Sequence, residues 1–268
     1  MEVKSHLDWN PVLADPSGRR QSKPRTLGKT MVIDKGLGLN AFEDLLDTSG
    51  AHLDMIKLGF GTSPLYPQSL LRTKINMAKA YDIHIYPGGT FLEVAIKQDA
   101  VDSFFNMITS LGFTGIEVSD GTIEIERGLR NQLIRRGLNE GLHVVTEYGK
   151  KAWGSAIELE ELIETVTLDI QHGAELVTIE ARESGLGVGI FDGEGNCKDA
   201  ELEQVLTAIP NSQEILLWEA PLKSQQLQLM NILGPNIHLG NICTQEIIAL
   251  EALRRGLRSD TMTFGQLK

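Results

Sequence analysis

Eight short segments rich in branched aliphatic residues recur along the chain, and most end at a charged residue or a glycine-rich tip. Strands that are buried on both faces have this character, because they are apolar throughout instead of alternating with polar residues. The segments are KTMVID at 29–34, LDMIKL at 53–58, IHIYPGG at 83–89, TGIEVSD at 114–120, LHVVTE at 142–147, ELVTIE at 175–180, EILLWE at 214–219 and NIHLGN at 236–241. The pattern predicts eight buried β-strands.

Between these segments apolar residues return every three or four positions, which is the period of an amphipathic helix. The periodic sets are Leu71, Ile75 and Ala78; Ile125, Leu129 and Leu133; Leu159, Leu162, Ile163, Val166 and Ile170; and Ile247, Leu250, Leu253 and Leu257. Four glycines follow helical stretches and predict left-handed helix ends: Gly112, Gly141, Gly173 and Gly234. Strands and helices are therefore expected to alternate.

This alternation over 268 residues predicts an α/β protein with a single-domain (β/α)₈ TIM-type barrel. The alternative is an open doubly wound sheet, which would place a glycine-rich dinucleotide turn after the first strand. The sequence there is KGLGLN at 35–40, which lacks the third spaced glycine. We place the barrel at 29–268.

Residues 1–28 form a separate N-terminal arm in this interpretation. They combine prolines and a basic cluster with little apolar periodicity. The arm is either a solvated tail or a strap that covers the bottom of the barrel or a neighbouring subunit.

Composition narrows the choice of partners. The net charge is −11, which argues against nucleic acid or an anionic membrane surface as a partner, since both require a basic face. No apolar run approaches a membrane span, and the N-terminus has no signal-peptide core, so we expect a cytoplasmic protein. Cys197 and Cys243 are expected to be reduced thiols, too few for a disulfide framework or a zinc site.

The strand ends carry the candidate chemistry, because a parallel barrel builds its active site where strands meet the following loops. The charged residues expected at this rim are Asp34, Lys57, Glu117, Asp120, Glu147, Glu180 and Glu219. Buried carboxylates need cations, a divalent metal or both, and an oxygen-only ligand set suits Mg²⁺. Zinc fits poorly, because the histidines His84, His143 and His238 fall within strands and are expected to be structural. Ser119 and Ser184 have no histidine at a telling spacing, which disfavours a hydrolase triad.

Cations occur in the segment TEYGKK at 146–151. If the chain stays extended past Glu147, Lys151 shares its face and points into the barrel mouth while Lys150 points away. The alternative is that both lysines are solvated loop residues. A lysine that is desolvated or held among cations can have its pKa lowered enough to exchange a proton.

Three loops after strands are rich in glycine and small residues that can bind anions: KLGFGTS at 57–63, PGGT at 87–90 and EARESGLGVG at 180–189. Arg182 in the last loop offers two donors to a phosphate or carboxylate. Simple turns, or a flexible lid for the last loop, are the alternative interpretation.

These motifs together resemble the phosphosulfolactate synthase family, from about residue 24 to the C-terminus. They are DKGLGL at 34–39, IKLGFGTS at 56–63, YPGGT at 86–90, IEVSDGT at 116–122, TEYGKK at 146–151, EARESGLGVGIFD at 180–192, EAPLKSQQ at 219–226, LGNI at 239–242 and LEALRRGLRSDT at 250–261. The resemblance implies Mg²⁺-dependent addition of sulfite to phosphoenolpyruvate, giving (2R)-phospho-3-sulfolactate. It also implies a homo-oligomer and a route to coenzyme M or to sulfolactate.

The resemblance assigns roles by position. Lys151 is the implied general acid that protonates C2 of an ene-diolate, Lys150 is a weaker candidate, and Glu147 is a third catalytic candidate. The implied anion-binding residues are Lys57, Gly88, Gly89, Thr90, Arg182, Glu183, Ser184 and Gly185. The implied metal or supporting carboxylates are Glu117, Asp120, Glu147, Glu180 and Glu219, without a ranking among them.

The chain departs from the family pattern at three places. Leu186 stands where a lysine is expected, which removes one contact to phosphate; Tyr148 replaces a small aliphatic residue, and FLE at 91–93 replaces LFE. Two rival functions remain at this stage. One is a non-catalytic, heat-stress-associated protein of the same family, and the other is a barrel aldolase that uses Lys151 as a Schiff base.

Overall fold

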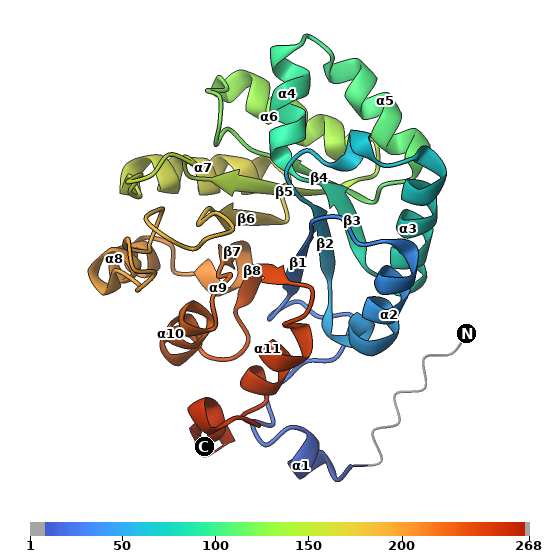
Figure 1. The fold of residues 1–268 in the computed structure, drawn as a ribbon. Helices are drawn as coiled ribbons and strands as arrows, with labels where there is room; N and C mark the ends of the chain where they lie inside the picture. The colour runs from blue at the N-terminus through green and yellow to red at the C-terminus, as the bar shows by residue number, and fades with distance from the viewer. Residues whose placement is uncertain (1–8, 266–268) are drawn as a thin grey trace.

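The computed structural model describes residues 9–265. Eight parallel strands surround a common axis and the helices lie outside them (Figure 1). The strands are β1 (Thr30–Asp34), β2 (Met55–Leu58), β3 (His84–Pro87), β4 (Gly115–Val118), β5 (His143–Tyr148), β6 (Leu176–Ile179), β7 (Leu216–Glu219) and β8 (His238–Cys243). Each predicted segment contains one of these strands or most of it, and the predicted (β/α)₈ barrel is confirmed.

The strands form one sheet in the order β3-β2-β1-β8-β7-β6-β5-β4. Its two end strands, β3 and β4, are joined next to their amino ends by Thr114. The Thr114 backbone N–H donates to the Ile85 carbonyl at 3.1 Å, and its hydroxyl accepts from the Ile85 N–H at 2.9 Å. The barrel is therefore nearly closed.

The helices lie outside the barrel, and the first of them lies apart from the strands at the bottom of the view (Figure 1). They are α1 (Pro11–Ala14), α2 (Leu39–Ser49), α3 (Gln68–Ala80), α4 (Gly89–Lys97), α5 (Val101–Leu111), α6 (Arg127–Asn139), α7 (Leu159–His172), α8 (Asp199–Ala208), α9 (Ser212–Ile215), α10 (Lys223–Leu233) and α11 (Ile247–Arg254), with short 3₁₀ helices η1 (Gly50–His52), η2 (Ser63–Leu65) and η3 (Ser259–Gly265).

The periodic sets locate four of these helices and miss two of their ends. Ile125 precedes α6, which begins after Glu126, and Leu257 follows α11, because Gly256 adopts a left-handed backbone at φ 72°. Gly112 and Gly173 close α5 and α7 with φ of 90° and 103°, as predicted.

Side-chain alternation along the strands separates two environments. Residues facing the helices join the large core, whereas six buried residues form a small cluster of their own: Met31, Met55, Tyr86, Val145, Leu176 and Leu217. Two positions beyond Met55, Val145 and Leu217 come Lys57, Glu147 and Glu219. Since side chains two apart on a strand share a face, this alternation carries the charged residues into the barrel mouth.

Asp34 does not join them, contrary to the expectation from its strand-end position. It pairs with the fully buried Lys74 of α3 and accepts hydrogen bonds from the backbone N–H groups of Gly36 at 2.8 Å and Leu37 at 2.9 Å. The reason is the alternation of side chains along β1: Met31 faces the barrel interior, so Asp34, three residues further on, faces the helices.

The described part of the arm, residues 9–28, contacts the rest of the chain. Arg20 pairs with Glu251 of α11 at 2.9 Å, and Arg25 pairs with Asp54, just before β2, at 3.1 Å. The Ser17 N–H donates to the Arg255 carbonyl at 3.1 Å, so α1 lies near the end of α11 (Figure 1). Residues 1–8 lie outside the described residues, and the boundary at residue 28 stays a prediction.

The three histidines lie in strands, as predicted, at or next to their amino ends and so away from the barrel mouth. The rings of His84 and His143 stack at 3.5 Å between centroids. Cys197 and Cys243 are free thiols. Across residues 9–265 none of the helices combines the length and the apolarity that a membrane crossing requires.

Candidate active site

Lys57 lies at the centre of the charged layer. Its ammonium is 2.9 Å from Glu117, 3.0 Å from Glu147 and 3.2 Å from Glu219. Burial alone would lower the pKa of Lys57, but these three carboxylates outweigh it and raise the pKa well above its ordinary value. Lys57 therefore stays protonated, and in this structure its ammonium holds together carboxylates from β4, β5 and β7.

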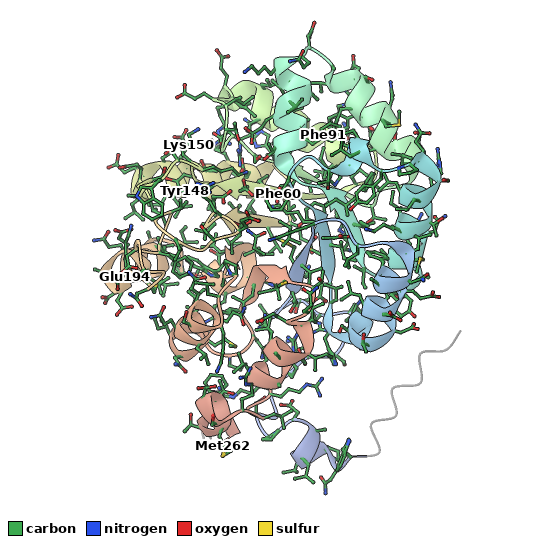
Figure 2. The ribbon with its side chains drawn as sticks, in the orientation of Figure 1. Phe60, Phe91, Tyr148, Lys150, Glu194 and Met262 are labelled. Carbon is green, nitrogen blue, oxygen red and sulfur yellow. The ribbon has the colours of Figure 1, made fainter. Side chains whose placement is uncertain are left out.

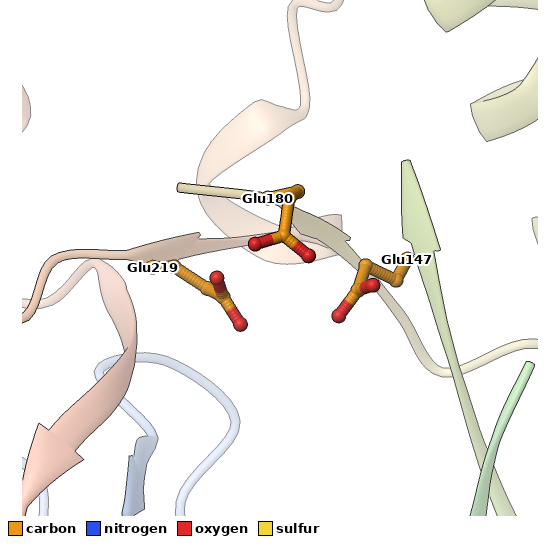
Figure 3. A group of neighbouring side chains, drawn as sticks. All are labelled: Glu147, Glu180 and Glu219. Atoms are coloured by element: carbon orange, nitrogen blue, oxygen red, sulfur yellow. The ribbon is translucent and has the colours of Figure 1, made fainter. Parts of the chain in front are cut away.

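Three buried carboxylates converge beside it. Each of Glu147, Glu180 and Glu219 presents one oxygen, and these oxygens lie within 4.8 Å of one another (Figure 3). Burial, followed by repulsion from Glu219 and Glu147, raises the pKa of Glu180 well above its ordinary value. Burial opposes ionisation of Glu147, but Lys57 and Lys151 outweigh it and lower its pKa.

The donor set fits Mg²⁺. All its ligand atoms are carboxylate oxygens, and the repulsion at Glu180 is what a divalent cation would relieve. Among residues 9–265 this is the one such group of three acidic, histidine or cysteine ligands. Glu117 and Asp120, also candidates from sequence, lie outside it: Glu117 contacts Lys57, and Asp120 pairs with Arg130 at 3.3 Å.

Lys151 contacts two of the same carboxylates from the open side of the barrel mouth. Its ammonium lies 2.8 Å from Glu147 and 3.3 Å from Glu180, and it donates to the Thr90 hydroxyl at 3.3 Å. Burial would lower the pKa of Lys151, but Glu147 and Glu180 outweigh it and raise the pKa, so the expected lowering is wrong. The Lys151 side chain is 29% exposed and that of Lys57 only 9%, so Lys151 is the more accessible proton donor.

The two adjacent lysines diverge. Lys150, labelled in Figure 2, donates to the Asp120 carbonyl at 2.9 Å and is 42% exposed. Between β5 and the lysines, Gly149 adopts φ 122°, and a Cβ there would come within 3.0 Å of the Glu180 side chain. The predicted separation of Lys151 from Lys150 is present in the structure.

The segment PGGT forms the start of α4, whose N-terminus therefore points toward the site. Its Gly89 N–H already donates to a Glu117 oxygen at 2.6 Å. A Cβ at Gly89 would lie 2.3 Å from the Ser119 hydroxyl oxygen, so only glycine allows this approach. Gly89 consequently ties Glu117 to α4, and Thr90 contacts Lys151.

In the loop after β6, Arg182 adopts a left-handed backbone at φ 61°. Its backbone N–H donates to Glu180 at 2.6 Å while its side chain is exposed. Glu183 pairs with Lys35 at 2.9 Å, Ser184 accepts from the Leu186 N–H at 3.3 Å, and the Gly185 carbonyl accepts from Gln225 at 2.6 Å. The partners of Glu183, Ser184 and Gly185 therefore lie outside the group of Glu147, Glu180 and Glu219.

Two buried supports were missed from sequence. Arg130 of α6 pairs with Asp169 at 2.7 Å and donates to the Glu147 carbonyl at 3.0 Å. Glu93 of α4 accepts from the Ser119 hydroxyl at 2.6 Å and from the Thr122 N–H at 2.8 Å. A signal existed for Arg130, because it lies on the apolar stripe of its helix, where a charged residue needs a partner.

An eight-stranded parallel barrel with buried carboxylates and lysines at the carboxyl ends of its strands has the architecture of a TIM-barrel enzyme. The YdjI aldolase of Escherichia coli K12 has a similar fold: TM-score 0.55 at 11% identity, covering 90% of this chain and 85% of that one. The sequence pattern of the (2R)-phospho-3-sulfolactate synthase (ComA) family matches residues 18–260, and the chain belongs to this family.

Curated relatives agree with this assignment. The phosphosulfolactate synthase of Methanothermobacter thermautotrophicus is 41% identical, over 91% of this chain and 94% of its own length. That of Methanocaldococcus jannaschii is 39% identical, over 90% and 95%. Protein HEAT-STRESS-ASSOCIATED 32 of Arabidopsis thaliana is more distant, at 23% identity over 88% of each chain. The chain is therefore that of an enzyme.

Proposed function

We propose that this protein adds sulfite to phosphoenolpyruvate in a Mg²⁺-dependent reaction that gives (2R)-phospho-3-sulfolactate. The names of its relatives support the product, and the site supports the chemistry. The observation that carries the proposal is the Lys151 ammonium at 2.8 Å from Glu147 and 3.3 Å from Glu180, at the open side of the three-carboxylate group.

The proposed addition begins with the sulfur lone pair of sulfite. It forms a bond to C3, the electron pair of the C2–C3 double bond moves to C2, and the negative charge spreads into the substrate carboxylate as an ene-diolate. Lys151 then transfers a proton from Nζ to C2, and the lysine is reprotonated from solvent. The raised pKa keeps Lys151 protonated before the reaction but also makes it a weaker acid, so the support for this role is the position of its ammonium beside Glu147 and Glu180.

Glu147, Glu180 and Glu219 would hold the metal ion in this proposal. When bound, Mg²⁺ supplies positive charge that stabilises the ene-diolate as a Lewis acid. The Lys57 ammonium pairs with Glu147 and Glu219, so their carboxylate oxygens already point toward the metal position before substrate binds.

The substrates bring phosphate, carboxylate and sulfite into one mouth, and donors around it would bind them. Lys57 is the buried cation, the start of α4 at Gly88 and Thr90 offers a helix N-terminus, and Arg182 with its glycine-rich loop offers a guanidinium at the rim. The exposed position of the Arg182 side chain suits a group that closes on the anion after it enters.

The Schiff-base aldolase is disfavoured by the charge state of its nucleophile. Imine formation needs a neutral amine, whereas carboxylates raise the pKa of Lys151. The non-catalytic alternative is disfavoured by the presence of Lys151, Arg182 and the carboxylate group in this chain. Homo-oligomerisation and a cytoplasmic location remain predictions.

The decisive assay combines purified protein with Mg²⁺, sulfite and phosphoenolpyruvate. We expect loss of phosphoenolpyruvate that depends on sulfite, with an organosulfonate product identified by mass spectrometry. Chelation of Mg²⁺ should abolish the reaction, and its re-addition should restore it. Absence of an organosulfonate, together with suppressed aggregation of a client protein, would establish the non-catalytic function; borohydride trapping with a carbonyl substrate would favour the aldolase.

A further inference from the structure

Tyr86 carries a polar group that the proposed mechanism does not use. It faces the barrel interior from β3 among apolar neighbours and is 2% exposed. Its hydroxyl oxygen is buried and has no hydrogen-bond partner among residues 9–265. A buried hydroxyl without a partner destabilises a fold, and phenylalanine would fill the same space without that cost.

The phenol lies next to the charged layer. Tyr86 is opposite Lys57 in the β2–β3 register, and its ring packs where β4 has Gly115. A Cβ at Gly115 would be 3.4 Å from the Tyr86 ring, so the ring lies directly against β4 at this position. Burial first, and then the charge of Glu117, raise the pKa of Tyr86 well above its ordinary value, so its hydroxyl keeps its proton and can donate.

Glu117 has a carboxylate oxygen that could accept a hydrogen bond from the Tyr86 hydroxyl. Its Oε2 accepts from the Gly89 N–H at 2.6 Å. Its Oε1 lies 2.9 Å from the Lys57 ammonium but accepts no well-directed hydrogen bond. Glu117 therefore has one oxygen tied to the start of α4 and another that depends on Lys57 alone.

Lys57 cannot serve every acceptor when substrate is bound. An ammonium has three N–H donors, and Glu117, Glu147 and Glu219 already occupy its surroundings at 2.9 to 3.2 Å. Turning toward a substrate anion would remove one carboxylate contact. An unpaired, fully buried carboxylate is costly, so another donor must replace Lys57 at the carboxylate that it leaves.

We propose that Tyr86 is a positioning residue whose hydroxyl donates to Oε1 of Glu117 when Lys57 turns toward the bound substrate anion. The hydroxyl holds the Glu117 carboxyl group in place, and with it the Gly89 N–H that donates to its other oxygen, so the start of α4 stays aligned for the same anion. This inference rests on the proposed function, because it assumes an anionic substrate above Lys57.

The test compares Tyr86→Phe with a matched control, Thr146→Val. Thr146 of β5 is fully buried and its hydroxyl also lacks a partner among the described residues, but it is out of phase with the inward-facing Glu147. Both variants remove a buried hydroxyl with little change of shape. Thermal unfolding, KM, kcat and calorimetric binding of phosphoenolpyruvate with Mg²⁺ are measured for each.

We expect Tyr86→Phe to raise the KM and weaken the binding of phosphoenolpyruvate about tenfold, the size expected for a hydrogen bond to a charged group, with Tm unchanged or higher. Thr146→Val should leave both binding and KM unchanged. An unchanged KM in Tyr86→Phe would overturn the inference, and so would a clearly lower Tm, since that would mean the hydroxyl is already bonded in the resting fold. A wild-type protein that neither binds nor consumes phosphoenolpyruvate would instead refute the proposed function, and this inference with it.

Discussion

Four lysines of this chain show how one residue type acquires different chemistry. Lys74 is fully buried and paired with Asp34, Lys57 is surrounded by three carboxylates, Lys151 reaches two carboxylates from the open side, and Lys150 turns to the Asp120 carbonyl. Of these four, only Lys151 contacts the group of Glu147, Glu180 and Glu219 while its side chain is partly exposed. At this scale the outcome depends on the direction of each side chain.

Replacing Lys151 tests that distinction. We expect Lys151→Ala to lower kcat by on the order of 10²-fold or more, the size of effect for a lost general acid. The matched control is Lys150→Ala, which removes the same charge one residue away and should change kcat far less. Steady-state kinetics with sulfite and phosphoenolpyruvate measure both, and circular dichroism checks the fold. Equal losses in the two variants would contradict the assignment of Lys151 as the acid.

At the scale of elements, α6 and α7 hold the site through one buried arginine. Arg130 pairs with Asp169 of α7, contacts Asp120 after β4 and donates to the Glu147 carbonyl of β5. The ends of two strands therefore depend on the packing of two helices. Glu147 belongs to the carboxylate group, so this network supports the position of a candidate ligand from outside the barrel.

Arg130→Ala should destabilise the fold strongly, by about 3–5 kcal/mol of unfolding free energy, because Asp169 is left buried without its main partner. Arg127 pairs with the same Asp169 at 2.6 Å, but its side chain is 30% exposed. Arg127→Ala should therefore cost no more than about 1 kcal/mol. Denaturant unfolding of the two variants compares them. Equal unfolding free energies for the two variants would show that the burial of Arg130 does not make its ion pair more stabilising than that of Arg127.

Over the whole molecule, the N-terminal arm is joined to the C-terminal helix. Glu251 of α11 lies 2.9 Å from Arg20 of the arm and 2.7 Å from Arg255. Burial opposes its ionisation, but the charges of Arg20 and its neighbours outweigh burial and lower the pKa of Glu251 to about 2. An ion-pair network of Arg20, Glu251 and Arg255 thus joins the arm before β1 to the helix after β8.

This network predicts a defined loss of stability in acid. The folded pKa is lowered, so the contribution of Glu251 is fully present above the ordinary value of 4.5 and is lost as the pH falls toward about 2. Glu251→Gln should lower Tm at pH 7, and the difference from wild type should shrink as the pH falls below 4.5. Scanning calorimetry across this range measures the difference. A Tm difference that does not change with pH would show that the carboxylate charge is not responsible.

Local periodicity was sufficient to predict the eight strands, their alternation with helices and the gathering of charged residues at one end of the barrel. These features depend on residues close in the chain, such as the inward-facing pair Val145 and Glu147, and on a general property of parallel barrels. Lys151 and Lys150 point in different directions, as predicted, but the extended chain on which that prediction depended ends at Tyr148, since Gly149 adopts φ 122°.

Other features depend on contacts between distant segments, and the chain alone left them open. The sequence does not show whether Asp34 points into the barrel or toward the helices. Both faces of β1 are buried, so the strand has no alternation of polar and apolar residues that would indicate its inward face. The convergence of Glu147, Glu180 and Glu219, and the raised pKa of Lys151, come from summing charges carried by separate strands. Electrostatic energy depends on distances in space, and those distances exist only once the barrel has closed.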